Sequence, residues 1–145
     1  MPDELLTIER VAVLHRVVLF SAVPGHTLLA VARLLEEIHV APDQTFIERG
    51  AVEDWLFVVA RGKARVHIGD RGIGHAGAGD VVGELAVLSP APRAASVTAL
   101  EPMLLLRLQR KPFEELLDDQ PEIARAVIET LARLLQASAE DGAEP

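Results

Sequence analysis

Residues 79–96 combine an acid, an arginine and a flexible glycine within one short loop. Glu84 follows Gly83 directly, and Arg93 lies nine positions further along. A guanidinium can donate two parallel hydrogen bonds to phosphate oxygens, and it keeps its charge when partly buried. A carboxylate only accepts hydrogen bonds, so its natural partner beside a bound anion is a hydroxyl donor such as a ribose. These residue types and their spacing predict a site for a phosphorylated sugar.

The local elements around these residues fit the same chemistry. A strand is expected to end at Val82, and residues 84–88 can form a single helical turn. The first N–H groups of such a turn have no partner within it and suit an anion. Pro90 and Pro92 then end the turn, and Arg93 is expected at the start of an apolar strand, partly exposed to solvent.

The segments on either side must position this loop. Apolar residues recur at helical spacing over residues 5–18 and again over 28–38, so helices are predicted up to residue 37. From residue 38 to 108 the pattern changes to about eight short strands separated by glycine-containing turns, which is typical of an antiparallel barrel or roll. The clearest runs are residues 45–47, 55–59, 64–68, 81–82, 95–100 and 103–108. Gly62 and Gly72 are expected to supply positive φ angles in tight hairpins.

Helical spacing returns after the predicted roll. Pro112 suits the first turn of a short helix, and a longer helix begins at Pro121, so helices are predicted over residues 111–137. Residues 139–145 read as a polar tail. The predicted fold class is α+β: one antiparallel β-roll, flanked by N-terminal helices and two C-terminal helices, in a single domain over residues 1–138.

Composition excludes several classes of protein. The chain has 145 residues, a net charge of −8 and no cysteine. A nucleic-acid surface needs clustered Lys and Arg, so none is expected, although a local pocket for one small anion is compatible with this charge. The most apolar early stretch, residues 11–23, is shorter than the about 20 residues a membrane-spanning helix needs. Because cysteine is lacking and the chain starts with acidic residues, a soluble, cytoplasmic chain is expected.

The loop also resembles a known family motif. Gly83, Glu84, Leu85 and Ala86, followed by Arg93, Ala94, Ala95, Ser96 and Val97, are similar to the phosphate-binding cassette of cyclic nucleotide-binding domains. That family includes protein kinase A regulatory subunits, cyclic-nucleotide-gated channels and bacterial catabolite activators. The resemblance extends from about residue 19 to about residue 136.

This resemblance implies a role for each matching residue. Arg93 would bind the cyclic phosphate, Glu84 the ribose 2′-hydroxyl, and Ala94 would favour cAMP, with cGMP as the second candidate ligand. The remaining cassette residues would line the pocket or donate backbone N–H groups: Gly83, Leu85, Ala86, Ala95 and Ser96. Leu134 and Ser138, on the terminal helix, would contact the base. The resemblance implies neither a catalytic residue nor a bound metal.

The sequence departs from the family pattern at three positions. Val82 replaces an aromatic residue, Asp43 replaces a glycine, and Ala76 stands where a larger aliphatic residue is expected. Glu84 could also be a surface acid near a helix N-terminus, and Arg93 a residue in a surface ion pair. The alternative hypothesis is therefore a structural or dimerisation module that keeps the fold without a ligand. A metal-dependent enzyme on a similar roll is a weaker third hypothesis, because the five histidines lack metal-ligand spacing.

The expected mechanism has two states. In one, the terminal helix lies away from the pocket, and in the other it folds over the ligand by hinging between Asp119 and Pro121. Leu131, Leu134 and Leu135 could pack on the roll or pair with a second copy, so a homodimer through this helix is one expected partner. An output domain outside this sequence is the other.

Overall fold

The computed structural model describes residues 5–143. The helices are α1 (Thr7–Leu14), η1 (Val18–Phe20), α2 (Gly25–Ala32), η2 (Glu84–Val87), α3 (Arg110–Asp119) and α4 (Pro121–Ala143). The strands are β1 (Glu36–Val40), β2 (Thr45–Ile47), β3 (Val52–Glu53), β4 (Trp55–Arg61), β5 (Lys63–Ile68), β6 (Arg71–Gly77), β7 (Val81–Val82), β8 (Ala91–Pro92), β9 (Ser96–Ala99) and β10 (Met103–Gln109).

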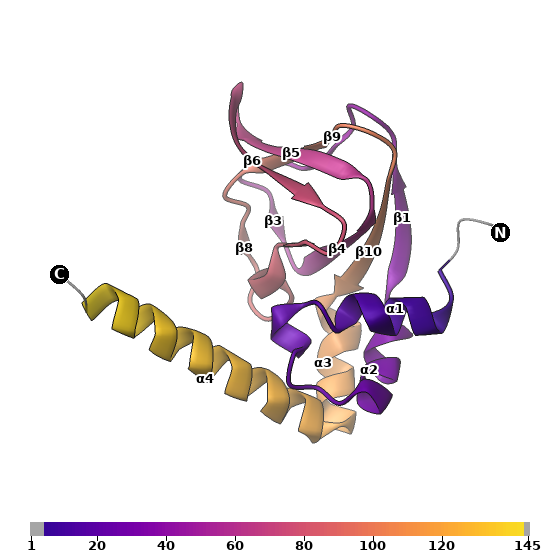
Figure 1. Ribbon diagram of the computed structural model, residues 1–145, viewed down its shortest axis with the longest axis vertical. Helices are drawn as coiled ribbons and strands as arrows, with labels where there is room; N and C mark the ends of the chain where they lie inside the picture. The colour runs from indigo at the N-terminus through magenta and orange to yellow at the C-terminus, as the bar shows by residue number, and fades with distance from the viewer. Residues whose placement is uncertain (1–4, 144–145) are drawn as a thin grey trace.

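Two four-stranded antiparallel sheets form the roll, as Figure 1 shows above the helices. The first has the strand order β1-β10-β4-β7 and the second β2-β9-β5-β6, while β3 and β8 make a separate short pair. The predicted α+β fold with an antiparallel β-roll is thus confirmed.

The two central strands of the first sheet, β10 and β4, are buried on both faces. In β4, Phe57 and Val59 face the inside of the roll, whereas Leu56 and Val58 face the helices. Alternate residues of a strand point to opposite faces, so burial on both sides requires a continuous apolar run. This explains why β4 and β10 could be recognised in the sequence.

Helices α1, α2 and α3 cover the outer face of this sheet, and α4 projects away from the roll (Figure 1). Arg10 of α1 connects this helix to the start of β1. Its Nη1 donates to Leu35 O at 2.9 Å and its Nη2 to Glu37 Oε2 at 2.9 Å. Burial raises the pKa of Glu37, but the hydrogen bonds from Arg10 and from Leu5 N–H outweigh it and hold that pKa below its usual value. Within residues 5–143, no helix combines the length and apolar character that crossing a membrane requires.

The second predicted helix was wrong beyond Ala32. Helix α2 ends there, and Glu36–Val40 forms strand β1, paired with β10 so that Glu36 lies opposite Arg107. Arg107 and Gln109 also donate side-chain hydrogen bonds to Glu36. The apolar spacing of residues 28–38 was compatible with a helix, but pairing with β10 overrides it.

The expected strand number and tail also need correction. The described residues contain ten strands rather than about eight, because β3, β6 and β8 lack a recognisable apolar pattern. Helix α4 continues to Ala143, so most of the predicted polar tail is helical; residues 144–145 lie outside the described residues. Arg110, rather than residue 111, is the first residue of α3.

Positive φ angles occur where the turns demand them, with one difference from the prediction. Gly62 has φ +96°, as expected, but the β5–β6 turn uses Gly69, at φ +58°, and not Gly72. Asp43 is the one non-glycine residue with positive φ among the described residues, at 67°. The position at which the resemblance implies a glycine therefore adopts a left-handed backbone here.

Candidate functional site

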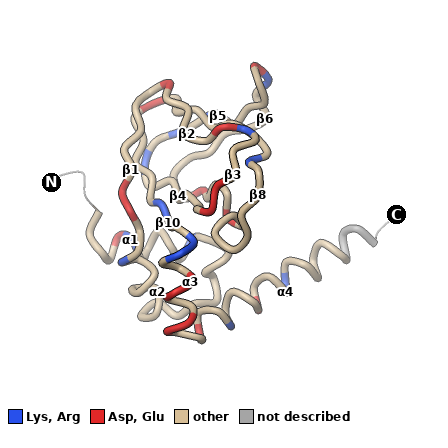
Figure 2. The backbone as a smooth tube through the Cα atoms, turned by 180° about the vertical axis from the view of Figure 1, so that it is seen from behind, with Lys and Arg blue, Asp and Glu red and all other residues tan. Residues whose placement is uncertain are grey.

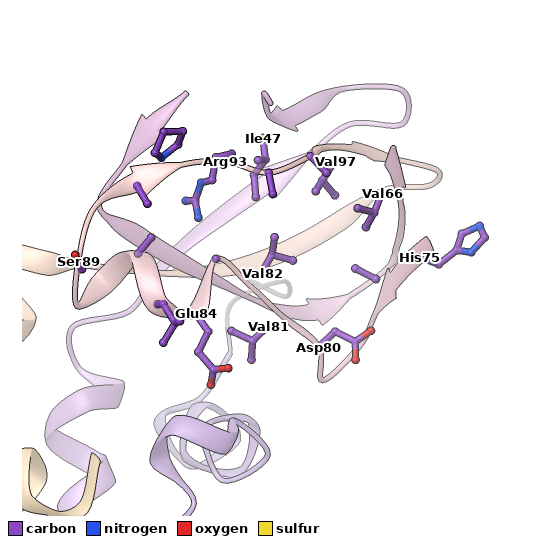
Figure 3. Close-up of a pocket in the computed structure, with 18 residues that line it drawn as sticks. Ile47, Val66, His75, Asp80, Val81, Val82, Glu84, Ser89, Arg93 and Val97 are labelled. Atoms are coloured by element: carbon purple, nitrogen blue, oxygen red, sulfur yellow. The ribbon is translucent and has the colours of Figure 1, made fainter. Parts of the chain in front are cut away.

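A cavity of about 750 Å³ opens between the roll and helix η2 (Figure 3). Its floor is apolar and comes from strands of both sheets, and its rim comes from the cassette loop. The apolar lining is Ile47, Val66, Ala76, Val81, Val82 and Val97. The loop contributes Gly83, Glu84, Leu85, Ala86, Ser89, Ala91, Pro92, Arg93, Ala94 and Ala95, and His75 and Asp80 complete the lining. A cavity with one apolar side and one polar side suits a ligand that itself has an apolar and a polar part.

Gly83 allows the loop to form. Its φ of +72° is left-handed, and η2 begins at the next residue, which confirms the predicted turn. A Cβ at this position would lie 1.7 Å from Arg93 Nη1 and 2.8 Å from its Cζ. Gly83 is therefore required both for its backbone angle and for the space that the guanidinium occupies.

Arg93 is held from one side by an ion pair. Its Nε donates to Glu53 Oε1 at 2.8 Å, and its Nη2 donates to the carbonyl oxygen of Trp55 at 2.7 Å. The arginine is 7% exposed, so the expectation of a partly exposed residue at the start of a strand was wrong. It lies between β8 and β9, and the pairing of β3 with β8 brings Glu53 beside it.

The loop that lines the cavity carries backbone N–H groups without an acceptor within residues 5–143. No described residue accepts a hydrogen bond from the N–H group of Ala94 or Ala95. The first N–H groups of η2 also have no acceptor within that helix. Two of the five N–H donors of the Arg93 guanidinium are used by Glu53 and Trp55, and the other three have no acceptor among the described residues. This end of the cavity is consequently rich in donors and suits an anion.

Glu84 takes a different direction from the one expected for a ribose contact. Figure 3 shows its carboxylate directed away from Arg93. Glu84 Oε2 accepts a hydrogen bond of 3.0 Å from the backbone N–H of Leu19, in helix η1. In this state, the acid connects the cassette to the N-terminal helices.

Seven of the predicted site residues line the cavity together: Gly83, Glu84, Leu85, Ala86, Arg93, Ala94 and Ala95. Ser96 does not, because its hydroxyl accepts a hydrogen bond from Arg49 N–H at 2.9 Å within the roll. Leu134 and Ser138 do not reach the cavity either. Both lie on the projecting part of α4, where Leu134 is 46% exposed.

Sequence reasoning missed the residues that position Arg93 and Glu84. Glu53 follows an exposed valine in a two-residue strand, and the Trp55 carbonyl and Leu19 N–H are backbone groups without any sequence signature. Each of these groups acquires its role only through a residue far away in the chain: Glu53 and Trp55 through Arg93, and Leu19 through Glu84. Among residues 5–143, no group of three or more His, Asp or Glu side chains is arranged to hold a metal ion.

Comparisons with known proteins match most of this chain. A family model described as "Cyclic nucleotide-binding domain" matches residues 37–141. A Pycsar effector protein of Xanthomonas perforans is 33% identical over 123 residues, which are 83% of this chain and 39% of that protein. A CRP-like cAMP-activated global transcriptional regulator of Mycobacterium tuberculosis is 27% identical over 131 residues, 86% of this chain and 58% of that protein.

A solved structure agrees over nearly the whole fold. The N-terminal domain of a transcriptional regulator from Streptomyces coelicolor superposes with a TM-score of 0.85 at 29% identity. The match covers 91% of this chain and 96% of that one. Both curated relatives are longer than the matched region, since this chain spans 39% of one and 58% of the other.

Proposed function

This chain belongs to the cyclic nucleotide-binding domain family, and on that premise we propose that it is a regulatory module that binds one cyclic nucleotide in the cavity beside Arg93. The observation that carries the proposal is the convergence of donors at one end of the cavity. Arg93, Ala94 and Ala95 are consecutive residues that all line the cavity, and the N–H groups of Ala94 and Ala95 have no acceptor among the described residues.

The phosphate is proposed to bind at this donor-rich end. Glu53 offsets the charge of Arg93, so attraction depends on directed hydrogen bonds as well as on net charge. The ion pair also orients the guanidinium before the ligand arrives, which lowers the entropy cost of binding. Each hydrogen bond involving a charged group contributes about 1.5–3 kcal/mol.

The base is proposed to lie over the apolar wall of the cavity, with cAMP preferred over cGMP. Ala94 has no hydroxyl with which to bind the edge of a guanine, and Ile47, Val66 and Val97 offer apolar contact. The mycobacterial relative is named for its activation by cAMP, which supports the same choice. Because the chain lacks cysteine, a reducing compartment such as the cytoplasm is its proposed location.

Helix α4 is proposed to close over the ligand or to pair with a second copy. In the structure it leaves the cavity open, and Leu135 is 70% exposed. Figure 2 shows few charged residues on the outer part of this helix, where Arg133 is the single charge within residues 130–139. Such a weakly charged helix suits a homodimer or contact with an output domain, each of which would transmit the signal.

Isothermal titration with 3′,5′-cyclic AMP, GMP, CMP and UMP tests the proposal. We expect one site per chain, tightest for cAMP, and at least about tenfold weaker binding for Arg93→Ala. Arg65→Ala is the matched control, because Arg65 lies on β5 of the same roll but does not line the cavity. A folded protein that binds none of the four nucleotides would instead favour the ligand-free structural module.

A further inference from the structure

Glu84 caps a helix that lies 65 residues earlier in the chain. Its Oε2 accepts from Leu19 N–H at 3.0 Å, and the residue before η1, Val17, provides no side-chain cap. Leu19 is 1% exposed, so no solvent replaces this acceptor in the described state. A buried N–H group without a partner is strongly unfavourable, and the position of η1 therefore depends on Glu84.

The same carboxylate is the cavity's candidate acceptor for a ribose hydroxyl. Arg93 marks the phosphate end, and Figure 3 shows the Glu84 carboxylate directed away from it. To meet a ribose attached to that phosphate, the side chain has to rotate toward the cavity. This rotation withdraws Oε2 from Leu19.

We propose that Glu84 exchanges its carboxylate between Leu19 N–H and the ribose of the ligand, so that nucleotide binding releases helix η1. This inference rests on the proposed function and adds a route for the signal. Ligand binding first changes the position of the N-terminal helices, and their movement then reaches α4. This route does not require α4 to cover the base.

Helix η1 contacts both C-terminal helices, α3 and α4, so its movement is transmitted to them. Phe20 of η1 packs edge-to-face on Phe113 of α3, with 5.8 Å between the ring centroids, and η1 also contacts α4. A second cavity, of about 440 Å³, separates Ala22 and Pro24 from the first turns of α4. The segment that follows η1 therefore borders open space on the side that faces α4.

The first test compares two ligands that differ by one hydroxyl. Amide hydrogen exchange at Leu19 is measured by NMR in the free protein, with saturating cAMP, and with saturating 2′-deoxy-cAMP. We expect cAMP to accelerate Leu19 exchange at least about tenfold, the factor that corresponds to a hydrogen bond with a charged group. The deoxy ligand, which cannot draw Glu84 into the cavity, should leave Leu19 protected.

The second test needs no ligand. Glu84→Ala should accelerate Leu19 exchange in the free protein to a similar degree. Asp80→Ala is the matched control, because Asp80 also lines the cavity and also caps a backbone N–H, that of Gly77 at 2.8 Å. That variant should expose the Gly77 amide and leave Leu19 unchanged.

The outcomes separate the two proposals. No saturable binding of any of the four cyclic nucleotides contradicts the proposed function. Saturable binding of cAMP with unchanged Leu19 protection, or equal effects of cAMP and its deoxy analogue, overturns the exchange of Glu84 while the binding function stands. Unchanged Leu19 exchange in Glu84→Ala overturns it independently of any ligand.

Discussion

Substituting Gly83 by alanine perturbs the site in a way that can be worked out from distances. The new Cβ would lie 1.7 Å from Arg93 Nη1, so the guanidinium has to leave its place. Its hydrogen bonds to Glu53 and to the Trp55 carbonyl are then lost or distorted. The backbone must also hold an alanine at φ +72°, which costs about 1–2 kcal/mol in the left-handed region.

Together these effects should lower the free energy of unfolding by about 2.5–5 kcal/mol, with at least about 1.5 kcal/mol from the displaced arginine. Domain stabilities of about 5–15 kcal/mol leave most of the protein folded. Affinity for cAMP should fall at least about tenfold, because Arg93 would leave the proposed phosphate site.

The assay is urea unfolding followed by the fluorescence of Trp55, the single tryptophan, combined with calorimetric titration of cAMP. Gly69→Ala is the matched control, since Gly69 also has positive φ, +58°, but an added Cβ there meets nothing within 4 Å. It should show the backbone cost alone and keep its affinity. If Gly83→Ala matches Gly69→Ala in both stability and affinity, the proposed packing of Gly83 against Arg93 is refuted.

Three further predictions concern selectivity, backbone strain and acid stability. Ala94→Thr should shift the ratio of the two dissociation constants toward cGMP in competitive titration, and an unchanged ratio would contradict the role given to this position. Asp43→Gly should raise the free energy of unfolding by about 0.5–1 kcal/mol because glycine adopts φ +67° without strain, whereas a loss of stability would oppose this reasoning. The pKa of Glu37 is lowered in the folded protein, so its contribution to stability is present above the unfolded-state pKa and is lost as the pH falls through the folded-state value. Glu37→Gln should therefore flatten the acid side of the stability–pH curve, and an equally steep decline in this variant would argue against it.

Much of the fold could be predicted because it depends on local patterns. Strands β4 and β10 have continuous apolar runs, since these two central strands are buried on both faces. Gly83 and Gly62 stand where the chain needs a left-handed backbone, and Pro121 separates α3 from α4. Most of the cassette residues that line the cavity lie within 11 positions of one another, from Gly83 to Ala94, so their grouping was already present in the sequence.

The remaining features depend on contacts between distant parts of the chain. Residues 36–38 continue a helical spacing, yet they pair with β10, because the hydrogen bonds of a strand come from its partner and not from its own sequence. The projection of α4 leaves Leu134 and Ser138 far from the site that their sequence positions suggested.

The sequence by itself thus determined the loop with its left-handed turn at Gly83, and the tertiary structure decided what each of its residues contacts. Arg93 is buried because the β3–β8 pair brings Glu53 to it across 40 positions. Glu84 holds Leu19 across 65 positions, instead of pointing toward Arg93. A local pattern fixes the backbone of a short loop, but the partner of a charged side chain is whichever group the rest of the fold brings within hydrogen-bonding distance.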